Sequence, residues 1–381
     1  MNLSNPSEPA LAEARHRAAR LLEQGPSSLP PVVTGFDGFV DEMISLVAER
    51  HSLDEFSPVH DIGAYAELVR AAAGHSSLRE IVVTGVHAGG CAVNLGDGLA
   101  ALGVPVDCFA TLGEPPHLAF GAVTSRFRSA HSWGREPGRT LAFEFSDGKL
   151  MYSAVRQLQE FTADDVRRRL DDGSYQSACG EAAIIALTDW TLYPHMTGVW
   201  VLLLEQVFAR LTHRPHFFFD LVDPSGRAGH DVREMLRVLP AFEEHGPVTL
   251  GLNGNEANIL ARLGGFRQAG ATVEDAARLA ADLRGQLGIS TVVIHRNKFA
   301  VAARAGEAAV TETPHAAQPR KSTGAGDRYN AGYLYGLLAG GSLQDCLLFG
   351  CAVAGYFVRQ AESPSRADLA GFLRRWAEGE L

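Results

Sequence analysis

Cysteine is scarce in this sequence of 381 residues, and the few thiols that it contains are far apart. There are five, at Cys91, Cys108, Cys179, Cys346 and Cys351, and no two of them form the C-x-x-C spacing that is typical of zinc sites. An odd and dispersed set of thiols also gives no sign of a disulfide framework. The sequence therefore predicts neither a zinc site nor a disulfide-linked fold, and we expect a reducing, cytoplasmic location.

Positive charge and long apolar runs are lacking as well. The 34 basic residues are outnumbered by 44 acidic ones, for a formal net charge of −10, whereas nucleic acid and anionic membranes attract basic surfaces. The longest apolar stretch, VWVLLLEQVF, is about half as long as a membrane span and contains Glu205. The first 30 residues have no apolar segment like that of a signal peptide. We therefore expect no nucleic-acid partner and no membrane partner.

The sequence is rich instead in short apolar runs that alternate with helix-period stretches. This alternation is typical of a mostly parallel sheet with helices on both faces. We expect residues 1–30 to form a helical extension and residues 31–381 to form one α/β domain, a three-layer α/β/α sandwich. The expected strands are PVVTGF (31–36), EIVVTG (80–85), VDCFATLG (106–113), AAIIALTD (182–189), HFFFDLV (216–222), VTLGLN (248–253) and STVVIHR (290–296).

One segment departs from this rhythm. Residues 138–155, GRTLAFEFSDGKLMYSAV, alternate with period two on both sides of Ser-Asp-Gly, which is the signature of a β-hairpin. A hairpin inserted in a series of βα units has to lie off the main sheet, where it is either a small β lid or an ordinary edge hairpin. Parts of residues 41–80 are candidates for the same accessory layer.

A glycine-rich turn before a helix is the first candidate site. The stretch STGAGDRYNAG (322–332) places Gly324, Ala325 and Gly326 directly before Asp327. The first N–H groups of a helix have no internal acceptor and the dipole makes that end positive, so a glycine turn there can wrap a phosphate. Asp327 could then act as a general base on a hydroxyl beside that phosphate, or it could simply cap the helix.

The segment TGAGDRYNAG resembles the C-terminal signature of the ribokinase-like carbohydrate kinases, the phosphofructokinase B family. The resemblance extends over residues 32–359. It implies an anion hole made by Gly324, Ala325 and Gly326, with Asp327 as the base that deprotonates the sugar hydroxyl. It also implies a nucleotide, ATP, bound by Thr323, Gly324, Gly326 and Asn330.

Two earlier segments match the parts of that family that contact the sugar. GGCAVNLGDG resembles its Gly-Gly motif, which implies sugar contacts from Gly89, Gly90 and Asn94. GFDGFVDEM supplies Asp37 and Asp41 after the first strand, where α/β sheets bind ligands. Asp41 matches the family's substrate carboxylate best. Either carboxylate could instead cap a helix over DEMISLVAER (41–50), and the two glycines could serve only a strand-to-helix turn.

A third segment matches the family's magnesium motif. Asn253 and Glu256, in GLNGNEANIL, form the N-x-x-E pattern that the family associates with magnesium and phosphate. Magnesium keeps several of its waters, so it needs few protein oxygens. The same pattern is also a capping box at the start of a helix.

Lys321 departs from the family pattern. The family commonly has an Asp at this position, three residues before Gly324, where it helps to hold a monovalent cation. An ammonium group in that place could replace the cation, so we expect activity without potassium. His295 stands where the family usually has a glycine, a feature shared with ADP-dependent sugar kinases, and this leaves the choice between ATP and ADP open.

The sequence thus predicts an ATP-dependent and Mg²⁺-dependent kinase that phosphorylates a primary hydroxyl of a sugar or a related polyol. A nucleoside kinase and a non-catalytic sugar-binding regulator on the same fold are the alternatives. The intact Gly-Ala-Gly-Asp stretch argues against the regulator, because a protein that only binds sugar needs no base. By analogy with related lids, we expect a homodimer.

Overall fold

The computed structural model describes residues 8–26 and 28–381 and contains two sheets. The larger has nine strands in the order β14-β13-β12-β11-β10-β9-β1-β5-β6. Their bounds are β1 (Val32–Phe36), β5 (Val106–Ala110), β6 (Ser129–Ser132), β9 (Ile184–Thr188), β10 (His216–Asp220), β11 (Val248–Asn253), β12 (Thr291–His295), β13 (Phe299–Arg304) and β14 (Glu307–Glu312). All neighbours pair in parallel except β12 with β13 and β13 with β14.

Helices cover both faces of this sheet. The helices are α1 (Glu8–Gln24), α2 (Ile62–Ala71), α3 (Cys91–Ala101), α4 (Gly121–Thr124), α5 (Ala163–Arg169), α6 (Ser174–Glu181), α7 (Met196–Gln206), α8 (Gly229–Val238), α9 (Gly254–Gly264), α10 (Val273–Leu287), α11 (Ala325–Leu338), α12 (Leu343–Gln360) and α13 (Arg366–Ala377). One hydrophobic core joins the sheet to α5–α10, and the other joins it to α1, α3 and α11–α13. The predicted three-layer α/β/α sandwich with a mostly parallel sheet is confirmed.

The apolar runs form strands because successive side chains enter opposite cores. Phe217 and Phe219 of β10 belong to one core, whereas Phe218 between them belongs to the other. The same holds for Ile184 and Ile185 in β9. Neither face of such a strand meets solvent, so successive residues are apolar, which explains the continuous apolar runs in the sequence.

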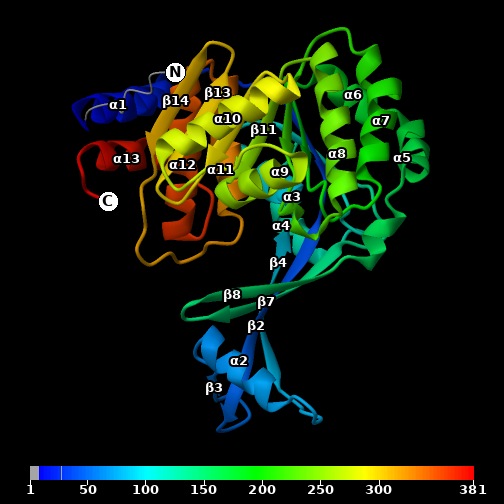
Figure 1. The fold of residues 1–381 in the computed structure, drawn as a ribbon, viewed down its shortest axis with the longest axis vertical. Helices are drawn as coiled ribbons and strands as arrows, with labels where there is room; N and C mark the ends of the chain where they lie inside the picture. The colour runs from blue at the N-terminus through cyan, green and yellow to red at the C-terminus, as the bar shows by residue number, and fades with distance from the viewer. Residues whose placement is uncertain (1–7, 27) are drawn as a thin grey trace.

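The second sheet has five strands and lies off the body. It is formed by β2 (Phe39–Arg50), β3 (Phe56–Pro58), β4 (Ile81–Gly89), β7 (Gly138–Phe145) and β8 (Gly148–Ala154), with β2 pairing to β3, β4 and β7. Figure 1 shows this sheet and α2 projecting from one edge of the body. The segment predicted as a hairpin, 138–155, forms β7 and β8, which pair antiparallel.

Two expectations for this region are wrong. The segment EIVVTG was expected in the parallel series, but it begins β4 and pairs with β2 in the second sheet. The alternative of a helix over residues 41–50 is also wrong, because these residues belong to strand β2. β4 and β7 flank β2 on its two sides, and this pairing outweighs the weak helical preference of the segment.

No helix within residues 8–26 and 28–381 combines the length and the apolar character needed to cross a bilayer. Of the expected N-terminal helical extension, residues 8–24 form α1, which packs on α13. Residues 1–7 and 27 lie outside the described residues.

Candidate active site

The glycine turn lies at the start of α11 and leaves donors free. Gly324 has φ 80°, a left-handed conformation that favours glycine, and it precedes the helix without any side-chain cap. In the described part of the chain, the amide groups of Gly326 and Asp327 have no protein acceptor. Two free N–H groups at the positive end of a helix can bind an anion such as a phosphate.

Asp327 lies buried at the first turn of α11, with 8% of its surface exposed. Its carboxylate accepts a hydrogen bond of 2.9 Å from the side-chain amide of Asn94. Burial, followed by the charge of Asp220, raises the pKa of Asp327 to about 7, although the neighbouring Arg328 opposes the shift. A carboxylate with a pKa near neutrality is well matched to general-base catalysis.

The same contact joins two motifs that lie 233 residues apart in the sequence. Asn94 is in the second turn of α3, and a Cβ added to Gly324 would lie 3.4 Å from its amide nitrogen and 2.8 Å from the guanidinium of Arg328. The glycine turn therefore packs directly on the segment that follows Gly90. The structure brings together the predicted base, the predicted sugar amide and the glycine turn, but the amide of Ala325, expected in the anion hole, donates instead to the carbonyl of Ser322 at 3.2 Å.

The two glycines before α3 make room for acidic residues of the first motif. Gly89 packs so closely on the carboxylate of Asp41 that no Cβ fits there. Gly90 has φ 96°, and a Cβ on it would lie 2.7 Å from the carbonyl oxygen of Asp37. Close approach of the backbone and a positive φ both require glycine at position 90, whereas a side chain at position 89 would have to displace the Asp41 carboxylate.

Asp41 is on β2 of the second sheet, where its carboxylate packs against Gly89. Burial raises the pKa of its carboxyl, whereas a hydrogen bond with Thr140 and the positive charges of Lys321, His87 and Lys149 lower it. Thr140 and His87 are the residues that pair with Asp41 on the strands at either side. The Asp41 carboxylate is therefore held among polar groups beside the turn.

Asp37 has a different environment. Its carboxylate accepts hydrogen bonds from the amides of Cys91 and Ala92 and, at 2.6 Å, from the hydroxyl of Thr188. It is 1% exposed. These partners occupy the carboxylate, so Asp37 fixes the start of α3, and Asp41 is the acid with more freedom to bind a ligand.

Asn253 and Glu256 form a capping box at the start of α9. The side-chain oxygen of Asn253 accepts from the amides of Asn255 and Glu256, each at 2.9 Å, and the Glu256 carboxylate accepts from the Asn253 amide at 2.8 Å. Burial, followed by the charge of Asp220, raises the pKa of Glu256 to about 8. A bound cation would relieve this repulsion between buried carboxylates.

The acidic residues fit a hydrated magnesium ion better than a protein cage. Among the residues described, no three His, Cys, Asp or Glu side chains are arranged to hold a metal ion directly. Magnesium retains waters and is commonly bound through one or two carboxylates and the phosphates of a substrate. Glu256, with Asp220 and Asp223 close enough to raise its pKa, matches that requirement.

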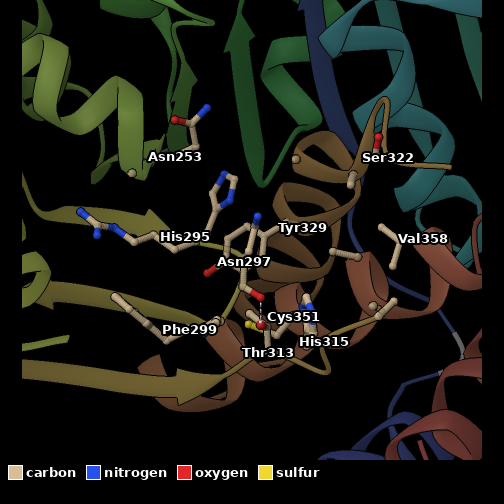
Figure 2. A pocket seen from close by; sticks show the side chains of 18 of the residues that line it. Asn253, His295, Asn297, Phe299, Thr313, His315, Ser322, Tyr329, Cys351 and Val358 are labelled. Carbon is tan, nitrogen blue, oxygen red and sulfur yellow. Dashed lines mark hydrogen bonds between the residues drawn. The ribbon is translucent and has the colours of Figure 1, made fainter. Parts of the chain in front are cut away.

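A cavity of about 900 Å³ opens beside the glycine turn. Figure 2 shows its wall, where the rings of His295 and Tyr329 stack at 4.5 Å between centroids. Asn253, Ala325 and Gly326 also line this cavity. It is large enough for a nucleotide, and both the N-x-x-E segment and the glycine turn line it.

Three residues that the sequence assigned to the nucleotide lie outside this lining. Asn330 is 2% exposed, and its amide donates at 2.6 Å to Asp220. The hydroxyl of Thr323 contacts the ammonium group of Lys149, which comes from β8. Gly324, between Thr323 and the helix, faces Asn94 and Arg328. Of the four, only Gly326 lines the cavity.

Sequence reasoning missed three residues of this site. Asp220 was given no role, although it ends β10, and the carboxyl ends of parallel strands are where α/β sheets bind ligands. Cys91, which directly follows the Gly-Gly pair, lies close enough to Asp327 to lower the pKa of its carboxyl. Lys149 follows the Asp-Gly turn of the hairpin, and no motif marks it.

Three comparisons with known proteins identify the family and the fold. The family model described as prokaryotic ketohexokinase matches residues 11–376. A ketohexokinase of Haloferax volcanii is 28% identical over 346 residues, which are 90% of each chain. A ribokinase of Thermotoga maritima has a TM-score of 0.62 at 17% identity, with 91% of this chain and 99% of that one covered.

A ribokinase of Arabidopsis thaliana, solved with ribose and ATP, has a TM-score of 0.61 at 19% identity and covers the same shares of the two chains. The resemblance to ribokinase-like carbohydrate kinases is confirmed. The match to the family model spans nearly the whole described chain. The protein is a carbohydrate kinase, and its chain belongs to the prokaryotic ketohexokinase family.

Proposed function

We propose that the protein transfers the γ-phosphoryl group of ATP to a primary hydroxyl of a ketohexose. The observation that carries this proposal is the position of Asp327, a buried carboxylate of raised pKa between free helix amides and Asn94. The name of the Haloferax relative supports a ketohexose as the acceptor. A base next to an anion-binding turn is what phosphoryl transfer to an alcohol requires.

Each group then has a defined task. Asp327 takes the proton of the acceptor hydroxyl, and the oxygen of that hydroxyl forms a bond to the γ-phosphorus. The bond between the γ-phosphorus and the bridging oxygen of ATP breaks, which releases ADP. The amides of Gly326 and Asp327 stabilise the charge on the phosphoryl oxygens. Asp41 and Asn94 orient the sugar hydroxyls, and the Gly-Gly backbone lets the sugar lie close.

We assign the nucleotide to the cavity lined by His295, Tyr329 and Gly326. Its apolar aromatic wall suits a nucleoside, and its end at the glycine turn suits the phosphates. Magnesium, held near Glu256 and Asn253 through water, would neutralise the charge of the phosphates. The hairpin β7–β8 acts as a lid over the acceptor, which excludes water from the reaction.

The variant Asp327→Asn tests the proposal. Asn has nearly the same shape as Asp, and Asp327 provides no cap to α11, so we expect the melting temperature to change little. Without a base, turnover of ATP with a panel of ketohexoses, aldoses and pentoses should fall by about three orders of magnitude or more. A variant that keeps its activity would remove Asp327 from the mechanism.

The acceptor panel also separates the rival functions. Because the fold of the ribokinase neighbours does not identify the acceptor, adenosine belongs in the same panel. A preference for adenosine over every sugar would favour a nucleoside kinase. A sugar that raises the melting temperature in a preparation without phosphate transfer would favour a regulator. ADP tested as the donor in the same assay decides between the two nucleotides.

A further inference from the structure

The chain contains very few lysines, and two of them are at the glycine turn. Only Lys149, Lys298 and Lys321 occur among the 34 basic residues, and all the others are arginine. Lys321 lies three residues before Gly324, and Lys149 reaches the same turn from β8 of the second sheet. In a chain that otherwise uses arginine for positive charge, two ammonium groups at one turn call for a local explanation.

Lys149 joins the hairpin to the turn. Its ammonium group contacts the hydroxyl of Thr323, 174 residues further along the chain. In Figure 1 the hairpin β7–β8 extends beneath the part of the body that carries α11 and α12. The contact therefore bridges the accessory sheet and the loop that would hold the phosphate.

Both ammonium groups are half-buried without an acidic partner. Within residues 8–26 and 28–381, neither Lys149 nor Lys321 forms an ion pair, although 19 pairs involve arginine. Lys321 instead lies 5.6 Å over the ring of Phe357. Burial lowers the pKa of both lysines, and the charge of Lys321 lowers that of Lys149 further. Two unpaired cations that repel each other would be stabilised by an anion.

The charged groups around them define where that anion would lie. Asp41 and Glu144 face the two lysines from the second sheet, and Arg328 and Asp97 face Lys321 from the body. Arg328 is already paired with Asp97, at 2.6 Å. The unpaired positive charge thus lies between the free amides of the glycine turn and Asp41, on the acceptor side of the turn.

We propose that Lys149 and Lys321 form a phosphate site that holds the phosphoryl group as it arrives on the acceptor, with Lys149 supplied by the lid hairpin. The proposal rests on the proposed function and adds to it two ligands for the transferred group. Both ammonium groups keep their protons and donate hydrogen bonds to phosphoryl oxygens. The lid is thereby coupled to catalysis, because the site is complete only when the hairpin contacts the turn.

The kinetic test uses Lys149→Met, which keeps the length of the side chain and removes its charge. We expect kcat to fall about 100-fold, as when one preorganised donor to a transition state is lost, with the acceptor KM within about threefold of the parent. Lys149→Arg should restore a part of kcat, which a purely structural role would not require. Arg156→Met, which removes one exposed positive charge just after β8, is the control and should keep kcat.

A value of kcat within threefold of the parent for Lys149→Met would overturn the proposal. A parent protein that phosphorylates no acceptor would instead overturn the proposed function, and the phosphate site would then be judged by binding alone. The scarcity of lysine makes that measurement simple. Reductive ¹³C-methylation keeps the charges and labels only three side chains and the terminal amine.

Inorganic phosphate is the probe in the binding experiment. We expect the methyl signals of Lys149 and Lys321 to shift in a saturable way as phosphate is added, with each signal assigned from the Lys149→Arg, Lys321→Arg and Lys298→Arg variants. Lys149→Met should also abolish the shift of Lys321. A shift confined to Lys298, which lines the nucleotide cavity, or no shift at all, would contradict the site.

Discussion

At the scale of single residues, the aspartates of the site differ in pKa and in hydrogen-bond partners because their environments differ. Burial, followed by the charge of Asp220, raises the pKa of Asp327 to about 7, whereas Asp37 is tied to two amides and a hydroxyl. Asp220 itself has a pKa raised by burial to about 6 and is held by the amide of Asn330. Asp327, whose carboxylate accepts a hydrogen bond from Asn94 and which lies in the helix turn that has the free amides, is the carboxylate suited to accept a proton.

The first prediction is a pH dependence of turnover. A general base works only when deprotonated, so a pKa of about 7 for Asp327 predicts that kcat/KM rises between pH 6 and 8 and is level above that range. Asp220→Asn removes the nearest like charge, which should move the midpoint to lower pH. A profile that is flat from pH 6 to 8, measured at saturating magnesium, would contradict the assignment.

The sequence identified most of the residues that meet at this site, but not their partners. The motifs predicted that Asn94 and Asp327 serve one reaction, and the structure joins them by a hydrogen bond. The resemblance favoured Asp41 over Asp37 as the substrate carboxylate, but the sequence offered no physical reason, because the partners of the two acids, such as Thr188 and Thr140, come from distant strands. Contacts of that kind are a property of the fold and leave no local pattern.

The second prediction concerns Gly89. A methyl group there would collide with the carboxylate of Asp41. Gly89→Ala should therefore displace Asp41 and raise the acceptor KM about tenfold, as expected when a charged hydrogen-bonding group is misplaced. Gly285→Ala in α10 is the control, since its Cβ would meet open space and it should leave KM unchanged. An unchanged KM for Gly89→Ala would remove Asp41 from the acceptor site.

At the scale of elements, the local sequence pattern predicted strands correctly where burial on both faces determines the structure. All the main-sheet strands expected from apolar runs are present except EIVVTG, and these runs enter two cores at once. The errors fall in the second sheet, where half-buried strands lack that signal. The strands β6, β13 and β14 were also not anticipated. Two of them, β6 and β14, lie at the edges of the main sheet, where burial is less complete.

The start of α9 shows one pattern serving two purposes. The N-x-x-E segment forms the capping box that was the simpler expectation, and its carboxylate is also among the buried acids near the nucleotide cavity. A cap satisfies backbone groups of the helix, whereas a magnesium role concerns the remaining lone pairs of Glu256. The two roles are therefore compatible and can be separated by substitution.

Glu256→Gln is the third prediction. Gln is accepted at this position of a capping box, so the cap persists and the melting temperature should not fall. With one ligand charge removed, the magnesium concentration for half-maximal turnover should rise about tenfold, as for the loss of one supporting group in a metal site. Glu274→Gln, the same change in the first turn of α10, should leave it unchanged. If Glu256→Gln leaves the magnesium requirement unaltered, Glu256 only caps α9 and does not help to bind magnesium.

At the scale of the whole molecule, the second sheet has two unlike faces. One face carries Asp41, whose carboxylate packs against Gly89. On the other face, Val86 is paired across the strands with Glu42, Glu42 with Leu141, and Leu141 with Tyr152. These four side chains therefore lie on one face of the sheet. Val86 and Tyr152 are both 49% exposed. Tyr65 of α2 covers part of this face by stacking on Phe143, and the apolar side chains that stay exposed beside it are of the kind that commonly marks an interface.

We therefore predict that two copies of the chain associate through this face of the second sheet. Sedimentation should give a dimer for the parent protein and a monomer for the double variant Val86→Glu, Tyr152→Glu, because two buried and unpaired charges per subunit would oppose the contact. Val201→Glu, a similar change at an exposed position of α7 on the body, should remain dimeric. Since Lys149 lies on a strand of the same sheet, a dimer that fixes the sheet would also fix the lid, and the monomeric variant should lose kcat along with its partner. A parent protein that sediments as a monomer, or a double variant that stays dimeric, would exclude this face as the interface.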